Sequence, residues 1–178
     1  MALPAAALHL AGFLMAHALW SVSDLPAGQD YTPQAICETS DGDRQLTTFD
    51  GANAEESYAK LRDFASSETG RYAECALART TVVASGEVKA PALVIDLFAG
   101  PEPLLTIVQP FRPTASGGFR LLGPELMLAG HEQLPPRISD DASIALRDGA
   151  GDHPGMQDKW AEWNASRDPH SPLTVERR

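Results

Sequence analysis

The N-terminal segment, residues 1–23, contains no Asp, Glu, Lys or Arg. A segment of this kind is either buried in the core of the protein or removed from the chain as a secretory signal peptide. It lacks the basic residues that usually begin such a signal, and His9 interrupts its apolar run. It is also a poor membrane span, because Pro4, His9, Gly12 and His17 break it.

These features favour a buried strand over residues 13–22, in which Phe13, Met15, Ala18 and Trp20 contribute to the core. The alternative is a signal peptide that ends near Ala18. The strand interpretation predicts a cytoplasmic protein. The signal-peptide interpretation predicts a secreted or periplasmic one.

The chain is acidic, because 24 Asp and Glu residues against 14 Lys and Arg give a net charge of −10. Negative charge repels nucleic acid and anionic membrane surfaces, and the only adjacent basic pair is Arg177-Arg178 at the C-terminal end. We therefore expect neither nucleic acid nor membrane as a partner, and a protein partner fits the charge better. The length of 178 residues is typical of a single soluble domain.

Cys37 and Cys75 are the only cysteines, and their spacing matches neither a zinc motif nor a Cys-x-x-Cys redox motif. Both lie in apolar, strand-like surroundings. The preferred interpretation is two reduced thiols that pack as small hydrophobic side chains. In an oxidising compartment they would instead form one disulfide, worth about 3 to 4 kcal/mol in the chain-entropy description.

A capping pattern predicts one amphipathic helix over residues 53–67. Asn53 is a favourable N-cap, and Glu56 stands three residues later, at the spacing of a capping box. The apolar residues of the segment recur on one face. These residues are Ala54, Tyr58, Leu61, Phe64 and Ala65. We therefore expect this helix to cover one face of a sheet.

Much of the rest of the chain is typical of antiparallel strands. Asp41-Gly42 separates strand-like runs at about 33–39 and 44–49, which is a strong hairpin signal. Over residues 72–123, apolar runs rich in Val, Ile, Leu and Thr alternate with short turns that contain Gly. Those turns are too short for the crossover connections of a parallel sheet. The pattern therefore predicts an antiparallel meander.

Proline places a limit on one of these strands. Pro110 has no backbone donor, so the strand that begins near Leu104 is expected to end by Gln109 or to lie at an edge. Taken together, the predicted fold class is α+β, with a meander of about five to seven strands and one helix on a face. The predicted domain covers residues 10–130, and residues 131–178 form a polar, partly helical extension packed on it.

The sequence contains none of the common catalytic or phosphate-binding motifs, such as G-x-S-x-G, G-x-x-x-x-G-K-[ST], H-E-x-x-H or G-x-G-x-x-G. We expect no cofactor and no metal, and the absence of these motifs favours a protein that is not an enzyme. The catalytic candidates are Asp96, which is the single charge in an apolar run, its cross-strand partner Arg79, and His131. A cation site would need several polar groups of the extension to converge. Those groups are His131, Asp140, Asp141, Asp152 and His153.

Short helices are expected in the extension at about 140–147 and 155–164, with Trp160 and Trp163 on one side of the second. The two tryptophans either pack onto the domain or anchor a protein partner. The leading functional hypothesis is a small, acidic, non-catalytic protein that binds another macromolecule, as an inhibitor or adaptor does. The alternative is an enzyme or small-ligand-binding protein with a site where Asp96, Arg79 and the extension meet.

Overall fold

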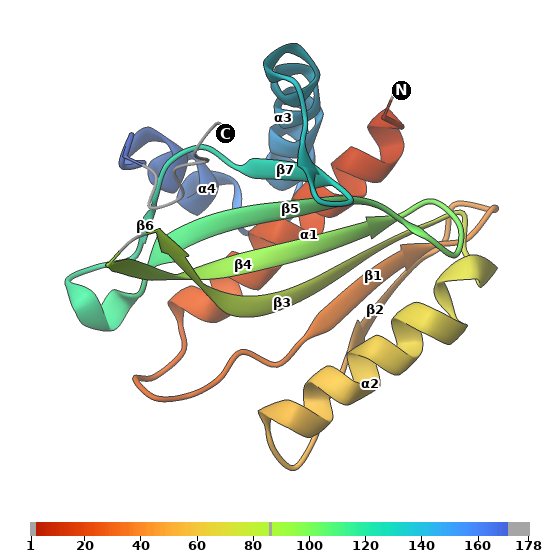
Figure 1. Cartoon of the computed structure of the whole chain (residues 1–178), viewed down its shortest axis with the longest axis horizontal. Coiled ribbons are helices and arrows are strands. Elements are labelled where there is room, and N and C mark those ends of the chain that lie inside the picture. The colour runs from red at the N-terminus through yellow and green to blue at the C-terminus, as the bar shows by residue number, and fades with distance from the viewer. Residues whose placement is uncertain (1–2, 86, 171–178) are drawn as a thin grey trace.

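The computed structural model describes residues 3–85 and 87–170. They form an α+β fold with four α-helices and an eight-stranded antiparallel sheet (Figure 1), so the predicted fold class is confirmed. The helices are α1 (Ala5–Ser23), α2 (Ala54–Ser67), α3 (Pro136–Gly151) and α4 (Gln157–Ala165). The strands are β1 (Gln34–Glu38), β2 (Arg44–Thr48), β3 (Glu74–Ser85), β4 (Val88–Phe98), β5 (Pro103–Arg112), β6 (Arg120–Leu121), β7 (Leu126–Ala129) and β8 (Glu132–Gln133).

The strands are ordered β2-β1-β3-β4-β5-β7-β8, and β6 pairs with the end of β5. The predicted hairpin is β1–β2, and the predicted meander contains β3, β4 and β5. β3 is much longer than β1. Gln34, the first residue of β1, pairs with Ala78, and residues 79–85 of β3 pair with β4 only. Pro33 precedes β1 and has no N–H to continue a ladder, so one edge of this half of β3 stays open (Figure 1).

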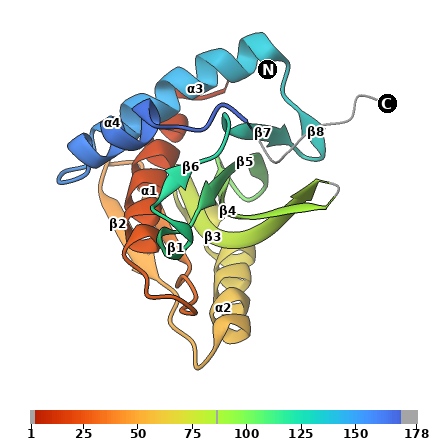
Figure 2. The same ribbon diagram turned by 90° about the vertical axis from the view of Figure 1, so that its left-hand side faces the viewer.

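The uncharged N-terminal segment forms the helix α1, so the predicted strand is wrong. α1 lies between the sheet and α3 (Figure 2) and is buried on most sides. A helix enclosed in this way is apolar all round, which removes the 3.6-residue periodicity that identifies a surface helix. Met15 and Ala18 do lie in the core, whereas Phe13 is only partly buried and Trp20 is exposed.

Two glycines allow α1 and α3 to pack closely. A Cβ atom at Gly12 would lie less than 3.0 Å from the carbonyl oxygen of Leu146, and one at Gly149 would meet the backbone of His9 equally closely. α3 is longer than the short helix expected at 140–147.

By length and hydropathy α1 could also cross a membrane, but 61% of its apolar window is buried inside the fold.

Cys37 on β1 and Cys75 on β3 stand directly opposite one another and form a disulfide, so the preferred interpretation of two reduced thiols is wrong. The pairing of β1 with β3 brings together residues that are 38 positions apart, across the β1–β2 hairpin and α2. Spacing in the sequence does not show such a pairing. The disulfide belongs to an apolar cluster that α2 covers, together with Phe49, Leu61 and Phe98.

α2 packs on the opposite face of the sheet from α1 (Figure 2), and its start follows the predicted capping pattern. The Asn53 side chain accepts a hydrogen bond from the Glu56 backbone N–H at 3.0 Å. The Glu56 carboxylate accepts one from the Ala52 N–H at 2.9 Å, one residue earlier than a standard capping box. α2 covers the β1 and β3 side of this face and leaves β4 and β5 without a covering helix (Figure 1).

β5 continues through Pro110 to Arg112, so of the two predicted outcomes the end by Gln109 is wrong. Pro110 pairs with Ala92 of β4, and its carbonyl oxygen accepts a hydrogen bond from Leu122 at 3.0 Å. The proline is tolerated because it lies between the short stretches of β5 that pair with β7 and with β6. No ladder bond is required from its nitrogen there.

Candidate functional site

The unpaired half of β3, residues 79–85, is the main open strand edge in the middle of the fold. The carbonyl oxygen of Thr80 accepts a hydrogen bond from the Tyr58 hydroxyl at 2.8 Å, so it points away from β4. Main-chain groups of alternate residues in an antiparallel strand point to the same side, so those of Val82 and Ala84 also face this edge. No strand in the described part of the chain pairs with them, and Val82 is 65% exposed.

A cavity lies on each face of the sheet beside this edge. The first has a volume of about 460 Å³ and lies between the end of α1, the loop of residues 25–31 and residues 113–115. Its lining is largely apolar, and Asp30 is the only charged residue in it. The second has a volume of about 500 Å³ and lies beneath α2. The two cavities share Tyr58 and Thr80, so they meet at the open edge.

The second cavity contains the Asp96–Arg79 pair that the sequence suggested. Arg79 Nε donates to Asp96 Oδ2 at 3.2 Å, and Thr106 Oγ1 donates to Asp96 Oδ1 at 2.8 Å. Both carboxylate oxygens of Asp96 therefore have a donor. This arrangement holds the Arg79 guanidinium in place at the cavity, and its Nη nitrogens make no hydrogen bond to another described residue.

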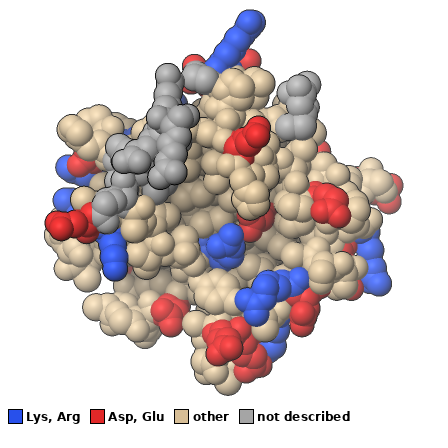
Figure 3. All heavy atoms as spheres, in the orientation of Figure 1, with Lys and Arg blue, Asp and Glu red and all other residues tan. Residues whose placement is uncertain are grey.

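The same cavity is locally basic. Its lining carries two guanidinium groups, from Arg62 and Arg79, against the single carboxylate of Asp96. Arg62 is exposed on α2 and forms no ion pair with any residue in the described ranges. The remaining lining is mostly apolar and includes Leu61, Ala65, Leu77 and Phe98. Figure 3 shows this face of the molecule, where charged side chains are sparse in the middle and more frequent around the rim.

The two tail tryptophans are buried. Trp160 is 5% and Trp163 is 7% exposed, and both belong to the core cluster around α1. The ring of Trp163 packs on that of Phe119, with centroids 4.6 Å apart. Neither ring is therefore presented as an exposed anchor, and the partner-binding role predicted for them finds no surface in this structure.

The expected meeting of Asp96 and Arg79 with the C-terminal extension does not occur. α3 and α4 pack on the α1 side of the sheet (Figure 2), whereas the Asp96–Arg79 pair lies in the cavity on the α2 side. His131 lies in the exposed turn between β7 and β8. Within residues 3–85 and 87–170, no three His, Cys, Asp or Glu side chains converge as metal ligands, so the polar groups of the extension form no cation site there.

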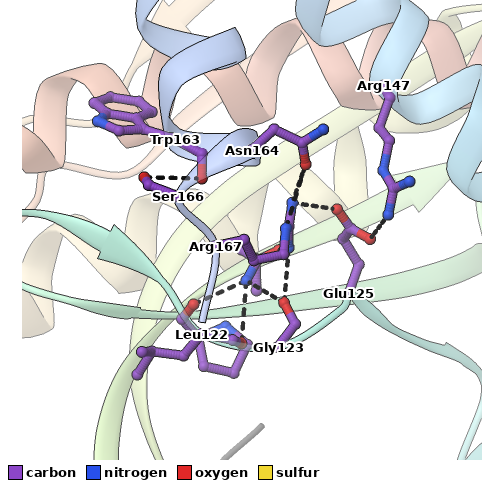
Figure 4. A network of polar contacts seen from close by, with 10 residues as sticks. Leu122, Gly123, Glu125, Arg147, Trp163, Asn164, Ser166 and Arg167 are labelled. Atoms are coloured by element: carbon purple, nitrogen blue, oxygen red, sulfur yellow. Dashed lines mark hydrogen bonds and ion pairs between the residues drawn. The ribbon is translucent and has the colours of Figure 1, made fainter. Parts of the chain in front are cut away.

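A network around Arg167 anchors the end of the described chain on the sheet (Figure 4). Arg167 Nη2 donates to Glu125 Oε1 at 2.9 Å and Nη1 donates to Gln109 Oε1 at 2.6 Å. Arg147 Nη2 reaches the other oxygen of Glu125 at 3.2 Å. The Glu125 side chain is fully buried, so its charge depends on these two guanidinium groups. This network is structural, because both carboxylate oxygens of Glu125 and both Nη nitrogens of Arg167 have partners within the fold, whereas Arg147 Nε is buried without a partner among the described residues.

A histidine pair, in which His153 is buried and His17 is partly buried, joins α1 to the turn between α3 and α4. His17 Nδ1 lies 3.1 Å from His153 Nε2, and Gln34 Nε2 lies 3.4 Å from the other ring nitrogen of His17. Tyr31 donates its hydroxyl proton to Gln34 Oε1 at 2.8 Å. Burial lowers the pKa of both histidines, and the neighbouring His153 lowers the pKa of His17 further. The pair spans 136 sequence positions, so the sequence offered no sign of it.

The sequence matches no family model, and no curated protein or solved structure shows significant similarity to the chain. The residues of the open edge were also missed by the sequence analysis. Tyr58 stood only in the apolar stripe of α2, and Thr80 and Val82 stood in an ordinary strand. Their importance comes from the difference in length between β1 and β3, which only the strand pairing reveals.

Proposed function

We propose that this protein binds another protein by strand addition at the open edge of β3. An extended segment of the partner pairs with residues 79–85 and directs its side chains alternately to the two faces of the sheet. The observation that carries the proposal is the unpaired half of β3 with a cavity on each face. Main-chain hydrogen bonds to the edge supply affinity, and the two cavities supply specificity.

This proposal keeps the expectation of a non-catalytic, macromolecule-binding protein and moves the binding surface from the tryptophans to β3. An open strand edge favours unwanted association, and proteins usually shorten, charge or cover it. Here the Tyr58 hydroxyl satisfies Thr80, while Val82 lies at the edge with an exposed apolar side chain. A partner strand would satisfy the remaining main-chain groups and cover Val82.

The test is a matched pair of substitutions at Val82, read by binding of the native partner in a pull-down followed by size-exclusion chromatography. Val82→Pro removes the N–H that faces the edge, and Val82→Thr retains that N–H with a side chain of similar shape. We expect loss of the complex with proline and retention with threonine. Thermal melting of both variants checks that each is folded.

The outer edge of the sheet provides the control, because β2 is also unpaired on one side. Leu46→Pro places the same change on that edge, where Leu46 is 47% exposed. If the complex survives Val82→Pro in a folded protein and is lost with Leu46→Pro, the binding edge is β2 and the proposal for β3 fails.

A second candidate function is the binding of a small ligand in the cavity beneath α2. Its volume of about 500 Å³ and its apolar lining with Arg79 and Asp96 suit a small molecule. Ala65→Trp fills this cavity, and Ser66→Trp places the same side chain on the exposed side of α2. For a small-ligand site, ligand-induced thermal stabilisation is lost in the first variant, kept in the second and insensitive to Val82→Pro.

A further inference from the structure

The two faces of an added strand meet different chemistry. Leu77 lies in the cluster beneath α2, and Ala78 lies in the core around α1. The period of two continues along β3, so Arg79 points to the α2 face and Val82 points to the α1 face. Residues paired across neighbouring strands share a face. A partner residue opposite Arg79 therefore faces the α2 cavity, and the neighbouring partner residue opposite Thr80 faces the α1 cavity.

The α2 cavity suits an acidic side chain. Thr106 and the Arg79 Nε occupy both oxygens of Asp96, which leaves the Arg79 Nη nitrogens without a described acceptor. The planar guanidinium group binds a carboxylate through two parallel N–H donors. Arg62 adds a second positive charge to the lining, so this cavity is basic within a chain of net charge −10.

The α1 cavity suits an apolar side chain. Leu25, Pro91 and Phe111 line it, and Asp30 is its only charged lining residue. A charged side chain would lose hydration in this cavity without gaining a basic partner. An apolar side chain would instead cover the exposed side chain of Val82, which points to the same face.

We infer that the partner contributes an extended segment in which an acidic residue, Asp or Glu, stands directly beside an apolar one in the sequence. The acidic side chain binds Arg79 beneath α2, and the apolar side chain fills the cavity beside the end of α1. This inference rests on strand addition at β3 and names the chemistry of the segment that is added.

The test uses three synthetic peptides with one backbone: acetyl-Ser-Val-Glu-Val-Glu-Val-Ser-amide and its counterparts with Gln or Lys in place of Glu. Each is titrated into the whole protein while the backbone amide resonances of residues 80–84 are followed by NMR. The ionic strength is about 0.15 M, which limits long-range repulsion from the acidic protein to about 8 Å. We expect the Glu peptide to bind about tenfold more tightly than the Gln peptide, and the Lys peptide to bind most weakly.

Three variants show which arginine gives the preference. Arg79→Gln should remove the preference for Glu over Gln, and Arg62→Gln should reduce it without disturbing the Asp96 pair. Arg71→Gln is the control, because Arg71 is exposed, pairs with Glu68 and lies outside both cavities. It should leave the preference unchanged.

The outcomes separate the inference from the proposed function. Equal binding of all three peptides, with resonance changes at residues 80–84, would overturn the acidic preference and leave strand addition standing. Tightest binding of the Lys peptide would also overturn it, since the net charge of the chain would then outweigh Arg79. No resonance change with any peptide would count against strand addition itself.

Discussion

Replacing Gly12 by Ala tests whether α1 is a permanent part of the core. Alanine in place of glycine inside a helix normally stabilises a protein by about 0.5–1 kcal/mol. At Gly12 the added methyl group would lie less than 3.0 Å from the backbone carbonyl of Leu146, so α1 and α3 must move apart. Overpacking of this kind costs about 1–3 kcal/mol. The clash is with backbone, which cannot rotate away, so the cost should exceed the gain in helix propensity.

We therefore expect Gly12→Ala to lower the free energy of unfolding by about 1–2 kcal/mol, and the melting temperature by roughly 5 °C for a chain of this size. The assay is urea unfolding followed by tryptophan fluorescence. Gly151→Ala is the matched control, because Gly151 lies in α3 and an added Cβ would meet no atom within 4 Å. That variant should be as stable as the parent protein or slightly more stable.

The close packing of α1 on α3 is refuted if Gly12→Ala is as stable as Gly151→Ala and the slope of the unfolding free energy against urea concentration is unchanged. Such a result would mean that α1 and α3 are not in contact in solution. The N-terminal segment would then be available to act as a signal peptide. Destabilisation would instead mean that removal of residues 1–18 takes away part of the core.

Two further predictions concern pH and redox state. Because the pKa values of His17 and His153 are lowered by burial, the unfolded chain binds protons more readily than the folded one, so stability is full above about pH 6.5 and falls as the pH drops through that value. Urea unfolding at about pH 7.5 and pH 5 should show this loss, and replacing both histidines by Gln should reduce it, whereas His131→Gln should not. Reduction of the Cys37–Cys75 disulfide, which spans 38 positions, should cost about 4 kcal/mol, and thiol titration of the unfolded native protein should find no free thiol. A free-thiol count of two in native material, or an unchanged melting temperature after reduction, would contradict the last prediction.

The Cys37–Cys75 disulfide and the burial of α1 both bear on the compartment in which the protein functions. Disulfides persist mainly in oxidising compartments, so the Cys37–Cys75 bond would require such a compartment to persist. A signal peptide that ends near Ala18 would remove most of α1, which the core contains. N-terminal sequencing of native material decides between these expectations. A start at Leu19 would contradict the prediction that the protein is cytoplasmic.

The features that the sequence predicted well are those set by neighbouring residues. The β1–β2 hairpin follows from Asp41-Gly42, and the start of α2 follows from Asn53 and Glu56. The meander of β3, β4 and β5 follows from apolar runs between short turns. The sequence pattern wrongly predicted a strand in place of α1, because a helix that is buried on most sides has no polar face and its sequence resembles that of a buried strand.

The candidate site was only partly predictable. Asp96 and Arg79 were paired correctly, because adjacent strands of a meander place such residues side by side. Their position beneath α2 depended on which face each helix covers, and a single sequence does not give that. The roles of Trp160 and Trp163 depended in the same way on the packing of α4. Local patterns predict elements, whereas sites formed between distant elements require the strand order.

The unequal lengths of β1 and β3 have a consequence for how a partner would be aligned. A segment added to residues 79–85 would meet the start of β1 at Gln34 and could not slide further along β3. Strand pairing is otherwise prone to slippage, and a shift of one residue would exchange the side chains on the two faces. β1 therefore acts as a register stop, which would keep the residue opposite Arg79 on the basic face of the site.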